Sequence, residues 1–242
     1  MPARIHALIP AAGQSLRFGG TIIKQYANLL GKPVIAHSID AVRRHADVVS
    51  VCVAISADDG LYNELVRPDY PGVATVVGGD CRARTVLNGL RHIARSMAGQ
   101  EEEPGQDWVL VHDAARPCLT AAALDRLIEQ AVNTGQGAIL AMPVSDTLKK
   151  ADSSGQISAT VSRQDMWSAQ TPQLFPLKEL LDSLESAVKF GIPPTDEAEA
   201  MERSNHPGWL VTGCADNIKI TRPEDLAIAE AILRRQRGSY DP

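Results

Sequence analysis

Five short apolar runs, separated by longer stretches with helical periodicity, limit the possible folds of this chain more than any other feature. The runs cover residues 4–10, 48–55, 73–77, 107–113 and 137–144. Most are apolar on both faces, which is the pattern of strands in a parallel sheet with both sides covered. The sequence therefore predicts an α/β fold built on a Rossmann-like, doubly wound, mostly parallel sheet.

The stretches between these runs carry apolar residues at helical spacing. The predicted inward faces comprise Ile35, Ile39 and Val42; Val86, Leu90, Ile93 and Met97; and Leu124, Leu127, Ile128 and Ala131. A last helix follows Thr221, which is predicted to form a capping box with Glu224, with Leu226, Ala229, Ile232 and Leu233 facing inward. A length of 242 residues suits a single domain covering 1–242.

Residues 144–168 break the pattern, because they alternate in polarity and have DSSG (152–155) at their centre. This predicts a β-hairpin arm that projects from the sheet. The arm has too few apolar residues to be stable alone, and a hairpin needs something to pack on. We therefore expect a homodimer that is joined partly through this arm.

Composition excludes several classes of partner. A net charge of −5 and an aromatic content of 4% disfavour a nucleic-acid-binding protein. No apolar run approaches the roughly 18 residues of a membrane span, and no signal peptide is evident. The four cysteines are scattered without metal-site spacing, which is typical of reduced thiols. We expect a cytoplasmic protein that binds small molecules, with no nucleic acid and no membrane as partners.

The first candidate site follows the first predicted strand. Small residues there let backbone N–H groups approach a ligand, and two cations come after them. The residues are Ala11, Ala12, Gly13 and Ser15, then Arg17 and Lys24. Neither GxxxxGK[ST] nor GxGxxG is present. The small residues alone fit a plain turn equally well, and the two cations shift the interpretation toward a site for a polyphosphate.

Further motifs narrow the class. They are GGDCRARTV (78–86), VHDAARP (111–117), PVSDTLK (143–149), VSR (161–163), QTPQLF (170–175), TDEA (195–198) and DNIKITRPEDL (216–226). The opening stretch resembles that of sugar-nucleotide and polyol-phosphate nucleotidyltransferases. The whole set, in this order, closely resembles the 2-C-methyl-D-erythritol 4-phosphate cytidylyltransferase family, the CTP-using family of the non-mevalonate isoprenoid pathway. The resemblance covers nearly the whole chain.

The resemblance implies a nucleotide site. The opening loop would hold the triphosphate of CTP, with Arg17 and Lys24 stabilising the charge that develops in the transition state. Nucleotide contacts are expected from Ala11, Ala12, Gly13, Ser15, Asp80, Arg82, Thr85 and Asp113. Asp113 and Asp216 would bind Mg²⁺, or another divalent cation, beside the α-phosphate. From the residues alone, Asp113 could also be a turn residue and Asp216 an Asx-type cap.

The resemblance also implies a site for the second substrate. Its phosphate would be held by Thr147, Arg163 and Lys219, with Asp113 and Thr171 near its hydroxyls. Arg163 and Lys219 join Arg17 and Lys24 as the predicted catalytic residues. Arg163 lies on the arm, so in a dimer it would reach the partner's site, although without the resemblance a solvated charge is the simpler interpretation. Residues that do not contact substrate but order those that do would be Arg116, Thr195 and Asp196. Alternatively, Thr195 caps a helix whose first turn contains Asp196 and Glu197.

The implied reaction transfers CMP from CTP to 2-C-methyl-D-erythritol 4-phosphate and gives 4-diphosphocytidyl-2-C-methyl-D-erythritol and pyrophosphate. The substrate attacks the α-phosphate in line, through its phosphate or, as a second option, through a free hydroxyl. His112 is expected to be structural rather than a general base. The main alternative is a ribitol-5-phosphate cytidylyltransferase. A nicotinamide-binding oxidoreductase is disfavoured, because the sequence lacks the GxGxxG fingerprint of such enzymes after its first predicted strand. A non-catalytic binding protein is disfavoured as well, because it would not need all of the charged residues named above.

Overall fold

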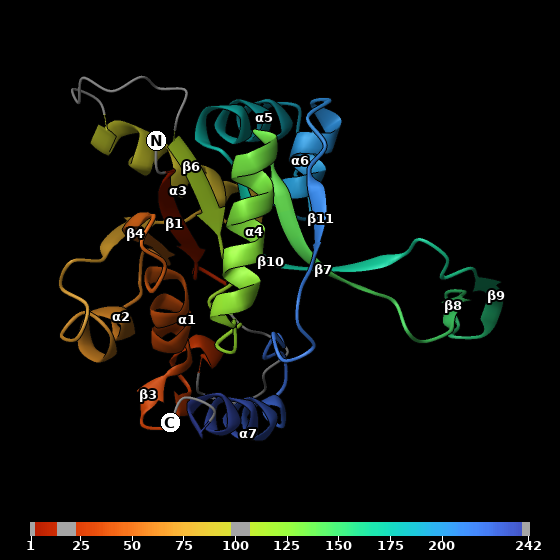
Figure 1. Ribbon diagram of the computed structural model, residues 1–242, viewed down its shortest axis with the longest axis horizontal. Coiled ribbons are helices and arrows are strands. Elements are labelled where there is room, and N and C mark those ends of the chain that lie inside the picture. Colours follow the sequence, from red (N-terminus) through yellow and green to blue (C-terminus); the bar gives the residue numbers. More distant parts are fainter. Residues whose placement is uncertain (1–2, 14–22, 98–106, 239–242) are drawn as a thin grey trace.

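The structure is a computed structural model that describes residues 3–13, 23–97 and 107–238. Its core is a seven-stranded sheet with the order β11-β7-β10-β6-β1-β4-β5 (Figure 1). The strands are β1 (Arg4–Pro10), β4 (Val48–Ile55), β5 (Ala74–Val77), β6 (Asp107–Val111), β7 (Ala138–Pro143), β10 (Trp167–Pro176) and β11 (Trp209–Thr212). All neighbouring strands are parallel except β10, which runs antiparallel to both β6 and β7. The predicted α/β fold with a mostly parallel sheet is confirmed.

All five predicted strands are present, with ends that differ by at most two residues from the prediction. Two strands of the seven-stranded sheet were missed. β10 carries Pro172 and several polar residues, and β11 has only four residues. Neither offers a long apolar run, so the pattern used to find the other strands could not detect them.

Helices cover both faces of the sheet. The residues of β1 accordingly alternate between two hydrophobic clusters, one on each face. Ile5, Ala7 and Ile9 face a cluster that includes α1 (Val34–Arg43), α2 (Leu61–Leu65) and α4 (Ala121–Thr134). Leu8 faces the opposite cluster, which includes α3 (Arg82–Met97), α5 (Leu177–Lys189) and α6 (Glu197–Arg203). Within the described ranges, no helix has both the length and the apolar character needed to cross a bilayer.

A third, smaller cluster lies beside the opening segment. It joins α7 (Asp225–Gly238) to residues near η1 (Lys24–Tyr26), β2 (Asn28–Leu29) and β3 (Lys32–Pro33), and to Ala115 and Cys118 after β6. As predicted, Ala229, Ile232 and Leu233 of α7 are buried in it. This packing brings the C-terminal helix next to the segment that carries Lys24.

The capping box predicted for α7 names the wrong acidic residue. The carboxylate of Asp225, not of Glu224, accepts hydrogen bonds from the backbone N–H groups of Thr221 (2.7 Å) and Arg222 (2.9 Å). The helix begins at Asp225, so Glu224 precedes its first turn and lies 3.9 Å from the Arg222 guanidinium.

The predicted hairpin arm is present. β8 (Leu148–Ala151) and β9 (Ile157–Val161) pair antiparallel, and the arm extends well away from the sheet (Figure 1). The turn is closed by the Asp152 carboxylate, which accepts hydrogen bonds from the backbone N–H groups of Ser154 (2.8 Å) and Gln156 (3.1 Å). Ile157 is 70% exposed, so the arm leaves apolar surface uncovered in the single chain.

Candidate active site

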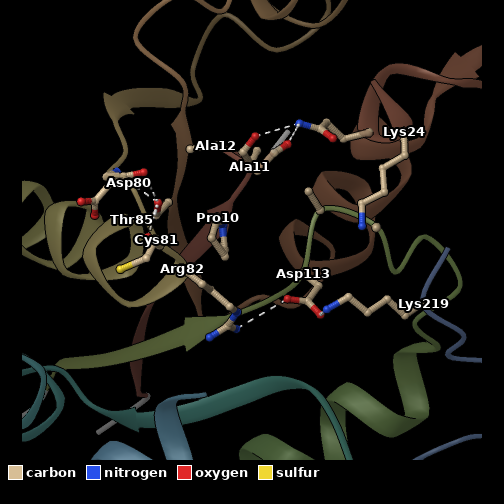
Figure 2. Close-up of a pocket in the computed structure, with 15 residues that line it drawn as sticks. Pro10, Ala11, Ala12, Lys24, Asp80, Cys81, Arg82, Thr85, Asp113 and Lys219 are labelled. Atoms are coloured by element: carbon tan, nitrogen blue, oxygen red, sulfur yellow. Dashed lines mark hydrogen bonds and ion pairs between the residues drawn. The ribbon is translucent and has the colours of Figure 1, made fainter. Parts of the chain in front are cut away.

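A pocket of about 350 Å³ lies at the carboxyl ends of the central strands (Figure 2). Its walls come from the segment after β1, the segment after β5, the segment after β6, and two more distant cations. The lining includes Ala11, Ala12, Gly13, Lys24, Asp80, Arg82, Thr85, Asp113 and Lys219. Open α/β sheets bind ligands in this position. Most of the predicted nucleotide residues are therefore brought together in one place.

The segment after β1 is held to the protein through its backbone. Ala11 donates its N–H to the carbonyl of Ala54 (2.7 Å). Gln25, which is buried, donates its side-chain amide to the carbonyls of Ala11 (2.8 Å) and Gly13 (3.5 Å). Gln25 was not predicted, and only its place beside Lys24 in the sequence pointed to it. Ser15 and Arg17 lie outside the described residues, so their predicted roles stay predictions.

The segment after β5 makes a tight turn around Thr85. The Thr85 hydroxyl accepts a hydrogen bond from the N–H of Gly79 (3.0 Å) and donates one to the carbonyl of Cys81 (2.9 Å). A Cβ at Gly78 would lie 2.6 Å from the Cβ of Ala12, so glycine lets the two loops approach. Asp80 is exposed on the rim, where its carboxylate pairs with Arg84 at 2.5 Å. Thr85 thus shapes the turn that presents Asp80.

Asp113 is the electrostatic centre of the pocket. Among the described residues, three cationic side chains lie within 3.5 Å of its carboxylate: Lys219 at 2.8 Å, and Arg82 and Arg116 at 3.5 Å. Burial on its own would raise the pKa of Asp113, but these cations outweigh it and hold that pKa well below its usual range. The carboxylate is therefore ionised throughout the physiological pH range.

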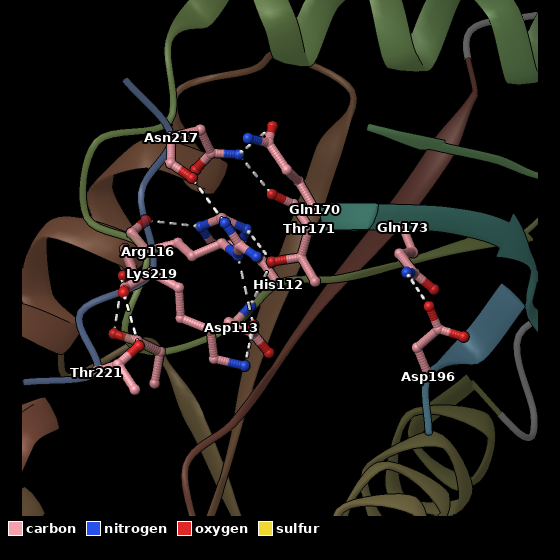
Figure 3. A network of polar contacts seen from close by, with 12 residues as sticks. His112, Asp113, Arg116, Gln170, Thr171, Gln173, Asp196, Asn217, Lys219 and Thr221 are labelled. Carbon is pink, nitrogen blue, oxygen red and sulfur yellow. Dashed lines mark hydrogen bonds and ion pairs between the residues drawn. The ribbon is translucent and has the colours of Figure 1, made fainter. Parts of the chain in front are cut away.

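A buried network supports Asp113 from behind (Figure 3). The backbone N–H of Asp113 donates to the Thr171 hydroxyl (2.9 Å), which also contacts His112 Nδ1 (3.1 Å). His112 Nε2 bonds to the carbonyl of Arg116 (3.0 Å). Burial lowers the pKa of His112 to about 4, so the ring is neutral. His112 is fully buried, and both of its ring nitrogens make hydrogen bonds, which fits the structural role expected for it.

The segment that carries Lys219 is fixed to the same network. The Arg116 guanidinium donates to the carbonyl of Asn217 (2.7 Å), and the Asn217 amide donates to the carbonyl of Thr171 (2.8 Å). Ile220 donates its N–H to the carbonyl of Ala115 (2.8 Å). These bonds explain how a lysine about a hundred residues from Asp113 in sequence comes to contact it.

Asp216 does not line the pocket with Asp113, and the predicted pair of metal ligands stays a prediction. The Asp216 carboxylate lies 2.5 Å from the Arg235 guanidinium of α7, and Asp216 does not line the pocket. The packing of α7 beside this segment provides that cation, which sequence spacing did not reveal. The described residues contain no cluster of three or more acidic, histidine or cysteine side chains arranged to hold a metal ion.

Arg82, the first residue of α3, has a second acidic partner that was missed. Glu197 of α6 is 1% exposed and binds Arg82 through both carboxylate oxygens, at 2.6 and 3.0 Å. The sequence suggested only a first-turn acid at this position. The helix cap is also corrected, since Asp196 rather than Thr195 accepts the N–H of Glu199 (2.9 Å). Thr195 instead donates its own N–H and hydroxyl to the Glu199 carboxylate.

Two predicted substrate residues lie away from the pocket. Thr147 and Arg163 belong to the arm, are exposed, and do not line the pocket within one chain. Thr171 is buried behind Asp113 and contacts its backbone rather than the open pocket. Of the described residues, the structure thus gathers the predicted nucleotide residues and Lys219 at the pocket, but not Thr147, Arg163 and Thr171.

The chain has close relatives. Residues 5–235 match the family described as 2-C-methyl-D-erythritol 4-phosphate cytidylyltransferase. The protein of that name from Shewanella oneidensis is 43% identical over 98% of this chain and 92% of its own length. The one from Shewanella amazonensis is 45% identical over 96% of this chain and 94% of its own.

Solved structures are similar as well. A crystal structure of 4-diphosphocytidyl-2C-methyl-D-erythritol synthase is 40% identical and superposes with a TM-score of 0.82, covering 96% of this chain and 100% of that one. The 2-C-methyl-D-erythritol 4-phosphate cytidylyltransferase of Francisella tularensis is 29% identical, with a TM-score of 0.80 and coverage of 95% of this chain and 100% of that one.

Proposed function

Because this chain belongs to the 2-C-methyl-D-erythritol 4-phosphate cytidylyltransferase family, we propose that the pocket around Asp113 is where CTP binds and reacts. The enzyme transfers CMP from CTP to 2-C-methyl-D-erythritol 4-phosphate in the non-mevalonate isoprenoid pathway. The observation that carries the proposal is that Lys24 and Lys219, almost two hundred residues apart, line one pocket with the backbone of Gly13.

The pocket suits a nucleotide polyphosphate in size and charge. Its volume of about 350 Å³ is within the range of small-molecule sites, roughly 300 to 1,000 Å³. The loop after β1 approaches the pocket with small residues, and Lys24 and Arg82 extend toward Asp113 from different sides (Figure 2). We assign the triphosphate to Ala11, Ala12, Gly13 and Lys24. The sequence adds Ser15 and Arg17, and the rim residue Asp80 faces the nucleoside.

The attacking atom is an oxygen of the substrate's phosphate. A diphosphocytidyl product, named for one crystallised relative, contains a P–O–P link between CMP and the substrate. Attack by a hydroxyl would give a phosphodiester instead, so that second option is wrong. An oxygen–phosphorus bond forms at the α-phosphorus, the bond from it to the bridging oxygen of the β-phosphate breaks, and pyrophosphate leaves. Lys219, with Thr147 and Arg163 from an arm, would hold the attacking phosphate, and Lys24 would stabilise the leaving charge.

The residues at the pocket suit one divalent cation that is bound by a carboxylate of the protein and by phosphate oxygens of the substrate. Mg²⁺ is commonly bound by one or two carboxylates, with phosphate oxygens and water completing its shell. Asp113 supplies one ionised carboxylate on the pocket wall. When bound, the metal would neutralise charge on the α- and β-phosphates. Asp113 already contacts Lys219, so binding of the metal would require the lysine to share or leave that carboxylate, and the lysine would then be available to the substrate's phosphate.

We also propose a homodimer in which each arm reaches the partner's pocket. The exposed apolar residues Ile157 and Val161 of the arm need a partner surface, and Thr147 and Arg163 have no place at the pocket of their own chain. Packing of α7 beside β2 and β3 supports a single domain over 1–242 with the arm at about 144–168. All four cysteines are free thiols, which supports a cytoplasmic location.

The test is pyrophosphate release from CTP and Mg²⁺ with either 2-C-methyl-D-erythritol 4-phosphate or ribitol 5-phosphate, in wild type and Lys24→Ala. We expect release with the first substrate only and its loss in the variant. If the variant released pyrophosphate as fast as wild type, the assignment of Lys24 to the triphosphate site would be wrong. Release with ribitol 5-phosphate alone would overturn the assignment of the second substrate.

A further inference from the structure

The Arg82–Glu197 contact links the pocket to a helix that does not line it. The Arg82 side chain is 31% exposed and borders the pocket, whereas that of Glu197 is 1% exposed. Two parallel N–H···O bonds, at 2.6 and 3.0 Å, fix the plane of the guanidinium as well as its position. The same guanidinium lies 3.5 Å from Asp113, so it is held between two carboxylates.

Glu197 is itself held in place from the sheet. The buried side chain of Gln173 on β10 donates to the Asp196 carboxylate (2.9 Å) and accepts the N–H of Ala198 (2.9 Å). These bonds contact the residues on both sides of Glu197. The first turn of α6 is therefore docked on the strand that also carries Thr171, behind Asp113.

Stability alone does not account for this arrangement. Replacing a buried ion pair by apolar side chains of similar size is often neutral or stabilising. The pair has a directional effect instead, because a flexible arginine at the pocket edge is restricted to one orientation. Without its acidic partner, the guanidinium could turn toward Asp113 and compete there with Lys219.

We propose that Glu197 is a positioning residue for the nucleotide site, which acts by fixing the orientation of Arg82. The inference rests on the proposed function, because it assumes that CTP occupies the pocket that Arg82 borders. Glu197 makes no contact with CTP in this scheme. Its effect appears as weaker CTP binding, not as a slower reaction of saturated enzyme.

The test compares steady-state kinetics of Glu197→Gln, Arg82→Gln and the double variant. Glu197→Gln keeps the size of the side chain and removes its charge. We expect it to raise the KM for CTP by about tenfold, with kcat and the KM for the methylerythritol substrate changed by less than about twofold. Glu202→Gln makes the same chemical change at an exposed position of α6 and should leave all constants within about twofold.

The double variant shows whether Glu197 affects CTP binding through Arg82 or by disturbing the fold in general. If Glu197 acts through Arg82, adding Glu197→Gln to Arg82→Gln causes no further rise in the KM for CTP. Multiplying effects would overturn the inference, as would a single Glu197→Gln variant with a wild-type KM. If Glu197→Gln does not fold, the double variant, which leaves no unpaired charge, carries the comparison with Arg82→Gln. An Arg82→Gln enzyme with unchanged CTP kinetics would count against the nucleotide site itself, not against Glu197 alone.

Discussion

The Lys219 ammonium lies 2.8 Å from the Asp113 carboxylate, so a cation assigned to the substrate's phosphate contacts the acid assigned to the metal. The pair joins the segment after β6 to a segment near the C-terminal helix. In the proposed scheme, the nucleotide and the acceptor would therefore bind next to each other.

Asp113→Asn should abolish most activity and destabilise the fold. The substitution removes the negative charge that Lys219, Arg82 and Arg116 surround, and breaking a buried pair in this way costs about 3 kcal/mol. Urea unfolding measures that loss, and pyrophosphate release should fall at least about a hundredfold. Asp216→Asn is the matched control. It alters a more exposed pair with Arg235, so the free energy of unfolding should change far less than in Asp113→Asn, and the activity should stay near wild type. An inactive Asp216→Asn enzyme would instead support the predicted role of Asp216 as a metal ligand.

Mixing two inactive variants should restore activity if the arm serves the partner's pocket. Lys24→Ala damages a chain's own pocket, and Arg163→Ala damages the pocket that its arm reaches. A heterodimer then contains one intact site, and co-expression should recover about a quarter of wild-type activity for random pairing. An arm that serves its own chain would leave every mixed dimer with two defective sites and no recovery. Sedimentation of the mixture checks that dimers form.

The cysteines should react with a thiol reagent in two classes. Burial raises the pKa of both Cys52 and Cys118 to about 12, so at pH 8 only about one molecule in ten thousand carries the thiolate at either position. Cys81 and Cys214 are partly exposed and should react in the native protein. CTP should protect Cys81, which lines the pocket, and not Cys214. Rapid labelling of all four thiols without denaturant would contradict this burial.

Stability should fall as the pH drops below about 6.5, the ordinary pKa of histidine. Burial lowers the pKa of His37 in the folded protein, so protons bind more readily to the unfolded chain and acid favours unfolding. His37 Nε2 bonds to the carbonyl of Leu29 (2.7 Å), a contact that glutamine can reproduce. His37→Gln should therefore reduce the difference in unfolding free energy between pH 7.5 and 5.5. Part of the difference remains, because burial also lowers the pKa of His6 and His112.

Gly137→Ala should destabilise the fold by about 2 kcal/mol through overpacking. A Cβ at this position would lie 1.9 and 2.2 Å from two ring carbons of Phe175, which is fully buried. Gly72→Ala is the control, because no heavy atom of the described residues lies within 4 Å of its Cβ position. That control should change the unfolding free energy by less than about 0.5 kcal/mol. Equal effects at the two positions would show that chain entropy, not packing, dominates.

Local patterns predicted most of the framework. The alternation of apolar runs and helical faces identified five strands and the buried sides of α1, α3 and α4, because burial imposes those periods directly. The arm was recognisable for the same reason, since its alternation differs from everything around it. Sequence motifs likewise identified the residues after β1, β5 and β6 that line the pocket.

Long-range pairing could not be predicted in this way. Glu197 looks like any acid in a first helical turn, and its contact with Arg82 depends on how α6 docks against β10. The contact between Asp216 and Arg235 was missed for a similar reason, because the position of Arg235 follows from the packing of α7. The corrected partners Asp196 and Asp225 each follow the predicted residue, Thr195 or Glu224, directly in the sequence, and local pattern could not decide between such neighbours.

The antiparallel pairing of β10 with both β6 and β7 limits where this chain can change in length. The arm's turn at 152–155 lies far from the sheet, so residues inserted there would lengthen the arm and leave the strand pairing intact. One residue gained or lost within β10 would instead turn every later side chain of that strand to the opposite face. It would carry Phe175 out of its core and Gln173 away from α6. Length variation among related chains should therefore be common at the tip of the arm and rare in β10.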